Sequence, residues 1–203
     1  MIIRHLGLTE QQPIYDAMRA FTRARTSDTP DEIWVTQHLS VYTVGQAGRE
    51  QHFPRVQTSI PVVRIDRGGQ ITFHGPGQGI VYVLVDISRR AITVRRMVEL
   101  LEQSVIDLLG GYNIDSSRKS GAPGVYVGNS KIAALGLRVR HGCTYHGVAL
   151  NIDMDLSPFD AIDPCGYPGQ RVTQLRDLGV HAPLEEVSDL LARRISEAME
   201  AQP

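Results

Sequence analysis

The sequence has few cysteines, a near balance of charges and no long hydrophobic run. Its 21 Lys and Arg residues face 22 Asp and Glu, which leaves a formal net charge of -1. A general nucleic-acid-binding protein needs an excess of basic residues on one face, so that class is excluded. No stretch approaches the ~18 consecutive apolar residues that span a membrane. The 2 cysteines are expected to be free thiols rather than a disulfide, because we expect a reducing compartment.

The amino terminus and the composition indicate a cytoplasmic, globular protein. Residues 1–6 lack the apolar core of a signal peptide, and Glu10 comes too early for an acid-poor transit peptide. The chain has 203 residues, of which 42% are hydrophobic and 21% charged. This is enough apolar material for a sizeable core, and it excludes a disordered or coiled-coil chain. No shift in composition demands a boundary, so we expect one domain over residues 1–203.

Three segments show the periodicity and end signals of helices. Apolar residues recur at helical spacing from Glu10 to Arg25, and Thr9 with Gln12 forms a plausible capping box at its start. Apolar residues mark one helix face from Thr93 to Leu109, and two glycines follow as a stop signal. A last helix is predicted to begin near Pro183, with acidic residues in its first turn, where the helix dipole favours them.

Strands are predicted where β-branched and aromatic residues cluster between turn signals. The predicted strands are residues 33–39, 62–65, 71–74, 80–87, 125–127, 131–140 and 144–152. A long polar loop is expected between the first two. Strands gathered between helices, without strict alternation of the two, favour an α+β fold: a mixed, mostly antiparallel sheet with surrounding helices.

The segment from Arg67 to Gly79 is rich in glycine and is a candidate ligand-binding loop. It lacks the Gly-Lys-Ser/Thr ending of a phosphate loop and does not match the dinucleotide fingerprint, so a nucleoside triphosphate site has no support. Its low side-chain bulk suits close approach of the backbone to an extended ligand, with Arg67 and His74 near its ends. An ordinary tight hairpin explains the same spacing equally well.

Two residues in predicted strands could carry chemistry or could be structural. Lys131 opens a strand of small and apolar residues; most such lysines are solvated, although apolar surroundings can turn a lysine into a base near neutrality. His146 lies in a strand beside a glycine, where a hydrogen-bonded structural histidine is the usual case. The 7 His show no ligand-like spacing with acidic residues or cysteine, so we expect no metal and no other cofactor.

The two cysteines differ in their local sequence. Cys165 lies between Pro and Gly in a predicted turn, where a thiol can be exposed and can act as a nucleophile. Cys143 is also close to a turn but leads into a strand, and inert cysteines are usually buried in strands or helices. Cys165 is therefore the stronger candidate for a reactive thiol.

Five stretches, taken together, resemble the lipoyl(octanoyl) transferase family, which moves an octanoyl group from acyl carrier protein to a lipoyl domain. They begin at Arg67, Ala122, Lys131, His146 and Pro164 and read RGGQITFHGPGQ, APGVYV, KIAALG, HGVALN and PCGY. Each stretch is weak alone, but five in the family's order over the middle half of the chain are specific. The resemblance implies the fold of the catalytic domain that biotin and lipoate ligases share.

The resemblance also implies roles for individual residues. Cys165 is expected to accept the acyl group as a thioester, with Lys131 as its partner in activating the thiol and moving protons. Exchange of one thioester for another needs no ATP, and a lysine of the lipoyl domain then forms an amide. The implied substrate-binding residues are Arg67, Gly68, Gly69, Gln70, Ile71, Thr72, Phe73, His74, Ala134, Leu135, Gly136, Gly147, Val148 and Ala149. Their pocket must hold eight carbons, at about 0.8 kcal/mol per buried CH₂.

The resemblance implies partners as well. The donor is octanoyl-acyl carrier protein, and the acceptors are the lipoyl domains of 2-oxoacid dehydrogenase E2 subunits and the glycine cleavage H protein. Because these proteins are acidic as a rule, arginines could form a complementary surface, or they could simply be solvated. The arginines in question are Arg89, Arg90, Arg95, Arg96, Arg138 and Arg140. We expect a monomer, with neither nucleic acid nor a membrane as partner.

Three alternatives stay open at this point. His74 or His146 could activate the thiol in place of Lys131, because histidine is the commoner activator. An ATP-dependent lipoate-protein ligase has a similar glycine-rich loop but needs no nucleophilic thiol, so Cys165 argues against it. A non-catalytic acyl-binding adaptor would keep the pocket but would have no need of both Lys131 and Cys165.

Overall fold

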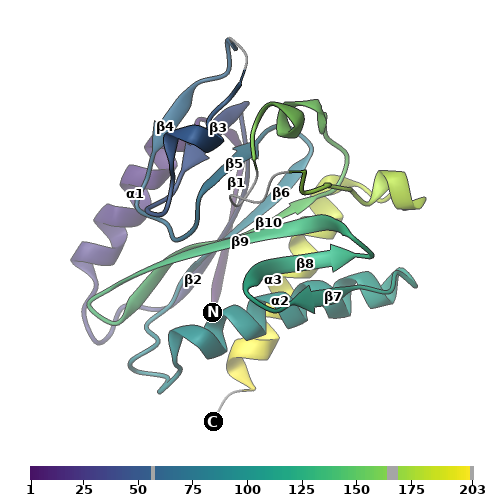
Figure 1. The fold of residues 1–203 in the computed structure, drawn as a ribbon. Coiled ribbons are helices and arrows are strands. Elements are labelled where there is room, and N and C mark those ends of the chain that lie inside the picture. The colour runs from purple at the N-terminus through teal and green to yellow at the C-terminus, as the bar shows by residue number, and fades with distance from the viewer. Residues whose placement is uncertain (56–57, 164–168, 202–203) are drawn as a thin grey trace.

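The computed structural model describes residues 1–55, 58–163 and 169–201 (Figure 1). Cys165, the predicted nucleophile, and the rest of its Pro-Cys-Gly-Tyr stretch lie outside these described residues. In the described part of the chain, no helix combines the length and the apolarity needed to cross a membrane.

A seven-stranded sheet forms the centre of the molecule, in the strand order β1-β2-β6-β10-β9-β8-β7. Its strands are β1 (Ile2–Thr9), β2 (Glu32–His38), β6 (Gln78–Leu84), β7 (Ser117–Lys119), β8 (Ala122–Val127), β9 (Ser130–Arg140) and β10 (Cys143–Asn151). Only the pair β1–β2 of this sheet is parallel among the described strands. The expectation of an α+β fold with a mostly antiparallel sheet is confirmed.

A second sheet of three strands, in the order β4-β3-β5, lies beside the first. Its strands are β3 (Val41–Val44), β4 (Val62–Arg64) and β5 (Ile71–His74); β3 pairs parallel with β4 and antiparallel with β5. The glycine-rich turn after β5 is therefore not the tight hairpin that its spacing allowed, because β5 and β6 belong to different sheets. At Gly77, with a φ of 89°, a Cβ would lie 1.9 Å from the Asp153 carbonyl oxygen, so the turn needs glycine to pack there.

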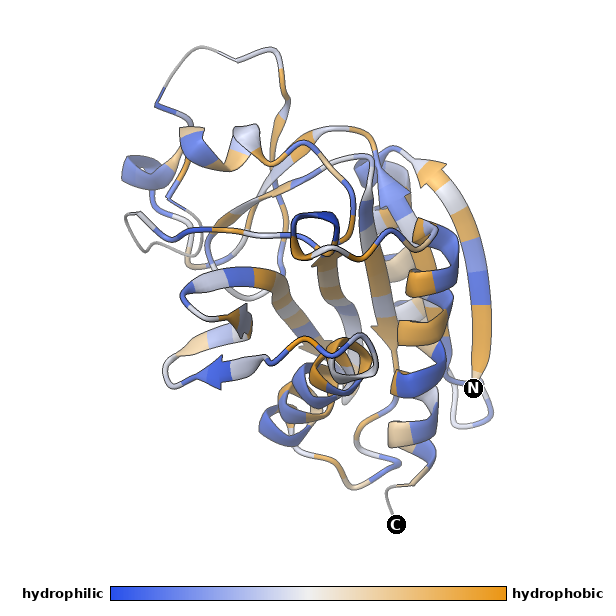
Figure 2. Ribbon diagram, turned by 90° about the vertical axis from the view of Figure 1, so that its right-hand side faces the viewer, coloured by the Kyte–Doolittle hydropathy of each residue, from blue (hydrophilic) through white to orange (hydrophobic). Residues whose placement is uncertain are grey.

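Three α-helices cover the large sheet: α1 (Gln11–Ala24), α2 (Val94–Gly111) and α3 (Leu184–Glu200). Helices α2 and α3 pack together on one face, over the apolar residues of the central strands, and α1 packs on the opposite face (Figures 1 and 2). Among the described residues, the 3-10 helices η1 (Glu50–His52), η2 (Ser157–Ala161) and η4 (Arg176–Leu178) lie in the connections. The predicted second and third helices are confirmed, and Thr93 caps α2 by accepting a hydrogen bond from the Arg96 amide.

The start of the first helix differs from the prediction. The residue at the N-cap is Glu10, which makes no side-chain cap hydrogen bond. The Thr9 hydroxyl instead lies 3.0 Å from the Thr36 hydroxyl, because Thr9 is the last residue of β1 and pairs with His38. The predicted capping box is thus wrong: pairing of the amino-terminal strand with β2 takes the threonine away from the helix.

The sequence patterns also missed three strands, β1, β3 and β7. In β1 the exposed and half-buried positions do not alternate regularly, because it is an edge strand with one neighbour, so no period of two was visible. Strand β3 lies in the region expected to be a polar loop, and β7 has only three residues. The remaining strands are confirmed to within a few residues of their predicted bounds.

Candidate active site

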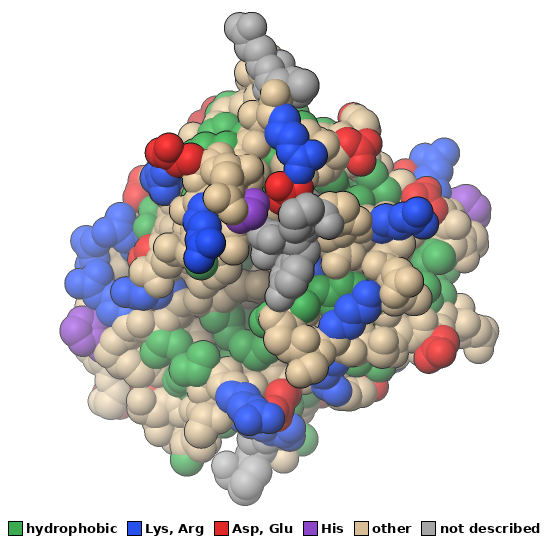
Figure 3. Space-filling view, viewed as in Figure 1, with side chains coloured by type: hydrophobic (Ala, Val, Ile, Leu, Met, Phe, Trp, Pro, Cys, Tyr) green, Lys and Arg blue, Asp and Glu red, His purple; other side chains and the backbone are tan. Residues whose placement is uncertain are grey.

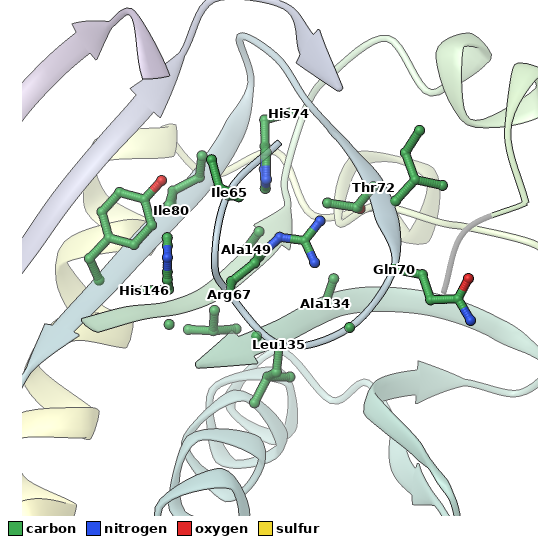
Figure 4. Close-up of a pocket in the computed structure, with 16 residues that line it drawn as sticks. Ile65, Arg67, Gln70, Thr72, His74, Ile80, Ala134, Leu135, His146 and Ala149 are labelled. Atoms are coloured by element: carbon green, nitrogen blue, oxygen red, sulfur yellow. The ribbon is translucent and has the colours of Figure 1, made fainter. Parts of the chain in front are cut away.

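The three predicted substrate-binding segments meet at one cavity, which we call the central cavity (Figure 4). It lies where β5 and the loop before it approach β6, β9 and β10, and it has a volume of about 530 Å³ with its mouth included. The lining residues are Ile65, Arg67, Gly69, Gln70, Ile71, Thr72, His74, Ile80, Tyr82, Ala134, Leu135, Gly136, His146, Gly147, Val148 and Ala149.

The floor of the central cavity follows from the register of three neighbouring strands. Gly136 of β9 pairs with Gly147 of β10, which pairs with Tyr82 of β6. Two residues along, Ala134 pairs with Ala149, and Ala149 in turn pairs with Ile80. Residues two apart in a strand share a face, so these two rows lie side by side. Small residues on β9 and β10 leave the space that larger side chains would fill.

The roof of the cavity is the loop from Ile65 to Gln70. The Gly68 amide donates a hydrogen bond to the Leu137 carbonyl at 2.9 Å, which ties the loop to β9. A Cβ at Gly136 would lie 3.0 Å from the Gly68 carbonyl oxygen and 3.1 Å from Arg67 Cδ. Glycine at position 136 is therefore what allows the loop to approach the sheet this closely.

A chain of buried polar groups runs from the roof along one side of the cavity. The Arg67 guanidinium donates to the Thr43 carbonyl at 2.7 Å and to its hydroxyl at 2.9 Å. That hydroxyl lies 3.1 Å from His74 Nε2, while Nδ1 lies 2.7 Å from Gln78 Oε1. The Gln78 amide then donates to Asn151 at 2.9 Å. Because the arginine can only donate, the Thr43 hydroxyl proton is directed to His74 Nε2, and His74 Nδ1–H donates to Gln78.

This network argues for a structural role for His74. Burial, together with the charges of His38 and Arg67, lowers the pKa of His74 to about 3. Both ring nitrogens are already engaged by Thr43 and Gln78. A neutral histidine with a low pKa and two occupied nitrogens is a poor base, so His74 serves the polar network rather than proton transfer.

His146 is held in a second polar cluster at the side of the cavity. Its Nε2 lies 3.2 Å from Asp66 Oδ1, and the Tyr145 hydroxyl donates to Asp66 Oδ2. Burial lowers the pKa of His146, although the Asp66 carboxylate opposes that shift. Burial alone would raise the pKa of Asp66, but the hydrogen bonds from His146 and Tyr145 outweigh it and hold that pKa below its ordinary value. An ionised carboxylate can only accept, so His146 Nε2 carries the proton.

Lys131 is a buried residue near the beginning of β9, only 4% exposed. Its amino group donates to the Pro123 carbonyl at 3.0 Å and lies 5.2 Å from the centroid of the Tyr126 ring. A Cβ at Gly124 would lie 3.0 Å from Lys131 Cε, so glycine there leaves room for the lysine side chain. The Gly124 amide donates to the buried Glu102 carboxylate at 2.9 Å, which anchors this part of β8 on α2.

A smaller hollow connects Lys131 with the central cavity. Lys131 lines it, and the hollow shares Thr72 and Ala134 with the central cavity. A wider groove on the other side of Lys131 shares Gly69 and Gly136 with the central cavity. Thr72 and Ala134 therefore mark the end of the central cavity that adjoins the hollow at Lys131, and we call this end the mouth of the cavity.

The segment after Cys165 runs alongside Lys131. The Lys131 amide donates to the Arg171 carbonyl at 2.8 Å, and the Thr173 amide donates to the Lys131 carbonyl at 3.0 Å. The Asn151 side chain donates to the Thr173 carbonyl at 3.0 Å. Residues 171–173 thus lie beside Lys131 at the beginning of β9.

Most of the predicted substrate-binding residues are brought together here, and two are placed elsewhere. Gly68 lines the groove beside Lys131, and Phe73 packs against Tyr42 and Phe159 in the core of the small sheet. His146, which the resemblance places in the pocket, lines it, and so do three residues that sequence reasoning did not assign to it, namely Ile65, Ile80 and Tyr82. The alternation of side chains along β6 could have predicted two of them, because Ile80 and Tyr82 lie two residues apart and share a face of that strand.

Cys143 lies at the first position of β10 and is buried. Burial raises the pKa of its thiol, and Sγ lies 3.7 Å from the His141 carbonyl oxygen. A buried thiol with a raised pKa is unreactive, and this agrees with the ranking of Cys143 below Cys165.

The arginines considered for a partner surface divide into two groups. Arg89 and Arg90 each bind the buried Asp31 carboxylate at 2.8 Å and so hold the structure together. Arg95 pairs with Glu99 at 3.0 Å on the surface of α2, and its side chain is 90% exposed. Figure 3 shows Lys and Arg side chains around a hollow that has apolar side chains in and below it. Arg89 and Arg90 thus have a structural role, whereas Arg95 is an exposed surface residue.

The model of the lipoyl protein ligase A/B catalytic domain matches residues 15–196. This chain belongs to that family. The chain is 53% identical to the octanoyltransferase of Dechloromonas aromatica over 98% of this chain and 97% of the relative. It is 54% identical to the octanoyltransferase of Thiobacillus denitrificans over 98% of this chain and 91% of that relative.

Solved structures of more distant proteins have the same fold as this member of the ligase A/B catalytic-domain family. A bipartite lipoate protein ligase from Thermoplasma acidophilum gives a TM-score of 0.77 at 18% identity, covering 98% of this chain and 84% of that one. A biotin protein ligase from Aquifex aeolicus gives a TM-score of 0.62 at 14% identity, covering 98% of this chain and 70% of that one. The fold expected from the resemblance is confirmed, and at these identities the likeness concerns the fold alone.

Proposed function

We propose that this chain is an octanoyltransferase of protein lipoylation that uses Cys165 and Lys131 to transfer the acyl group. The observation that carries the activity is identity above 50% to octanoyltransferases over nearly the whole of both chains. The central cavity supports it, because an apolar site floored by small residues beside a buried lysine suits a medium-length acyl chain. At about 0.8 kcal/mol per CH₂, its burial contributes several kcal/mol to binding.

In the first step, the Cys165 thiolate attacks the carbonyl carbon of the octanoyl thioester on the carrier. A bond from that carbon to Cys165 Sγ forms, and the bond to the phosphopantetheine sulfur breaks. Lys131 takes the thiol proton and returns it to the departing thiolate, so the carrier leaves as a free thiol. One thioester replaces another, so the step needs no ATP.

In the second step, the amine of an acceptor lysine attacks the thioester on Cys165. A bond from the carbonyl carbon to the lysine nitrogen forms and the bond to Cys165 Sγ breaks, and a proton lost from that nitrogen passes through Lys131 to the sulfur, so an amide forms and Cys165 leaves as a thiol. A lysine amine is mostly protonated near neutrality, because its reference pKa is about 10.4, so a proton must be removed before or during the attack. Lys131 is the group we assign to receive it, because it lies at the mouth of the cavity and beside residues 171–173.

The partners that we propose are octanoyl-acyl carrier protein as donor and apo lipoyl domains as acceptors, those of 2-oxoacid dehydrogenase E2 subunits and the glycine cleavage H protein. The Thermoplasma acidophilum protein of the same fold is the ligase of an archaeal lipoylation system and is described together with its E2 lipoyl domain. The exposed Arg95 on the surface of α2 suits acidic partners of this kind.

Intact-mass spectrometry after mixing with octanoyl-acyl carrier protein tests the covalent step. We expect the wild type and Cys143→Ala to gain the mass of one octanoyl group and Cys165→Ala to gain none. Cys143→Ala is the matched control, because Cys143 is buried and its thiol pKa is raised. Transfer to a lipoyl domain by Cys165→Ala at the wild-type rate would contradict the thioester route. A requirement for ATP with free octanoate would favour a ligase instead.

A further inference from the structure

The two ends of the central cavity differ in what lies next to them, and we call the end next to Lys131 the open end. The open end leads through Thr72 and Ala134 to Lys131. The other end is formed by Ile65, Tyr82 and His146, which line the central cavity but neither of the hollows that reach Lys131. Figure 4 shows Ile65 and His146 on one side of Arg67, with Thr72 on the other. An acyl chain whose carbonyl lies near Lys131 therefore points its methyl end toward His146.

The His146 imidazole is fixed more firmly than an ordinary pocket side chain. It is 2% exposed, and its ring lies 5.7 Å from the Tyr15 ring, stacked on it, and 6.1 Å from Tyr82. Its backbone has a φ of 64°, a left-handed conformation that costs a non-glycine residue energy and persists where the surroundings enforce it. The neighbouring rings thus hold the imidazole in place, and the fold holds its backbone in a conformation that an unfolded chain would leave.

Asp66 supplies the polar contacts that hold this end of the cavity. It accepts hydrogen bonds from His146 Nε2 and from the Tyr145 hydroxyl, both on β10. It directly precedes Arg67 in the roof loop, and on the other side of Arg67 the Gly68 amide binds Leu137 of β9. Asp66 itself does not line the cavity, and its side chain is 27% exposed. The carboxylate therefore acts on the cavity through His146 and through the position of the loop.

We propose that Asp66 is a positioning residue that sets the depth of the acyl site, because it fixes His146 as the end wall at which the methyl end of the chain stops. This inference rests on the proposed function, since it takes the central cavity as the acyl site. A rigid end wall admits eight carbons but excludes longer chains. Loss of the Asp66 contacts lets the imidazole move and deepens the site.

The test compares acyl carrier protein loaded with octanoyl, decanoyl or dodecanoyl groups as donors. The readout is the intact mass of the lipoyl domain over time, from which kcat and KM are obtained for each donor. The variants are Asp66→Ala, Asp66→Asn, which keeps one acceptor oxygen, and His146→Asn. Asparagine tolerates a positive φ better than other residues but is shorter than histidine. Asp153→Asn is the matched control, because Asp153 is an exposed carboxylate that pairs with Arg176 at 2.8 Å.

We expect the wild type and Asp153→Asn to prefer octanoyl over dodecanoyl donors. In Asp66→Ala and His146→Asn we expect the ratio of kcat/KM for the octanoyl donor to kcat/KM for the dodecanoyl donor to fall by about ten-fold. A change of this size corresponds to the burial of about two further methylene groups of the dodecanoyl chain. For Asp66→Asn we expect a ratio between that of these two variants and that of the wild type. For octanoyl itself, KM should rise more than kcat falls, because the reacting end at Lys131 is untouched.

Unchanged chain-length ratios in folded Asp66→Asn and His146→Asn would overturn the proposal and leave Asp66 a purely structural role. Thermal unfolding shows whether Asp66→Ala folds. If it does not, Asp66→Asn and His146→Asn alone test the proposal. A calorimetric titration with free octanoate, decanoate and dodecanoate needs no turnover and tests the same end wall. Absence of octanoyl transfer by the wild type would refute the proposed function, whereas the binding ratios would still decide the depth of the cavity.

Discussion

The two faces of the seven-stranded sheet are built from the same strands but carry different side chains. Toward α2 and α3 the strands present large aliphatic residues, such as Val83 of β6 and Leu150 of β10, which are fully buried. Toward the small sheet the same strands present Gly136, Gly147 and Ala149, with polar groups above them. One face is filled and the other is left partly empty.

This difference indicates that one face of the sheet mainly stabilises the fold and that the other mainly forms the binding site. Dense packing of aliphatic groups supplies most of the favourable free energy of folding. A cavity floored by glycine and alanine gives up packing and therefore stability, and such a site is kept where it binds something. Changes on the helix face should thus act on folding, and changes at the cavity should act on turnover.

The largest effect is expected from Lys131→Ala. Loss of a group that moves protons in both steps should lower the rate of octanoyl transfer by about 10²- to 10⁴-fold, with little change in the thermal unfolding midpoint. Single-turnover assays with octanoyl-acyl carrier protein and a lipoyl domain measure the rate. The division between the faces would fail if this variant unfolded at a much lower temperature than the wild type.

Lys119→Ala is the control for that variant. The Lys119 amino group lies 4.5 Å from the centroid of the same Tyr126 ring that Lys131 approaches to 5.2 Å, but Lys119 lies on β7, outside the cavity. We expect wild-type transfer rates from it. A comparable loss in both variants would mean that the lysines act through Tyr126 rather than through protons, and a larger loss in His74→Ala than in Lys131→Ala would reinstate the histidine as the activator.

On the helix face, Leu101→Ala is expected to act on stability. Leu101 is fully buried in the core under α2, and truncation of such a leucine costs about 2–5 kcal/mol in the free energy of unfolding. Urea unfolding followed by circular dichroism measures it. The KM for the octanoyl donor should not change at a temperature where the variant is folded, and a raised KM would show that the two faces are coupled.

Leu8→Ala makes the same change on the surface. Leu8 lies on the edge strand β1 and is 52% exposed, so its truncation removes little buried area. We expect its free energy of unfolding to stay within about 0.5 kcal/mol of the wild type. The gap between the two leucine variants measures how much of the stability the helix face supplies.

The same contrast explains which features could be predicted from the sequence. Helix α2 was predictable because it buries one regular face, and β10 because β-branched and aromatic residues cluster in it. Strand β1 and the pairing of Thr9 with β2 were not, since an edge strand needs no alternation and a capping motif says nothing about a competing strand. Local pattern decides an element only where tertiary contacts agree with it.

The site divides in the same way. Arg67 and Gly147 were assigned to the pocket through the family resemblance of the stretches that contain them, whereas residue type alone left both alternatives open for Lys131. Tyr82 and Asp66 were not found, because their roles depend on strand register and on a hydrogen bond across 80 residues of sequence. No local pattern contains that information.

The last prediction concerns pH and the buried polar chain beside the cavity, where we expect no large effect on turnover near neutral pH. The pKa of His74 is lowered to about 3 by burial, while in the unfolded chain it is about 6.5. Between these values the unfolded state binds a proton that the folded state does not, so stability is full above about pH 6.5 and falls as the pH drops. His74→Gln cannot titrate, so we expect stability to depend less steeply on pH between about 4 and 6, by up to about 1.4 kcal/mol per pH unit.

Urea unfolding at a series of pH values measures that slope, and His181→Gln makes the same substitution at an exposed position. The control should keep the wild-type slope. His74→Gln should also be less stable than the wild type at pH 7, because Thr43 and Gln78 lose partners that fit them. A slope equal to that of the wild type would mean that His74 takes up its proton while folded, and the polar chain would then have to open without unfolding the protein.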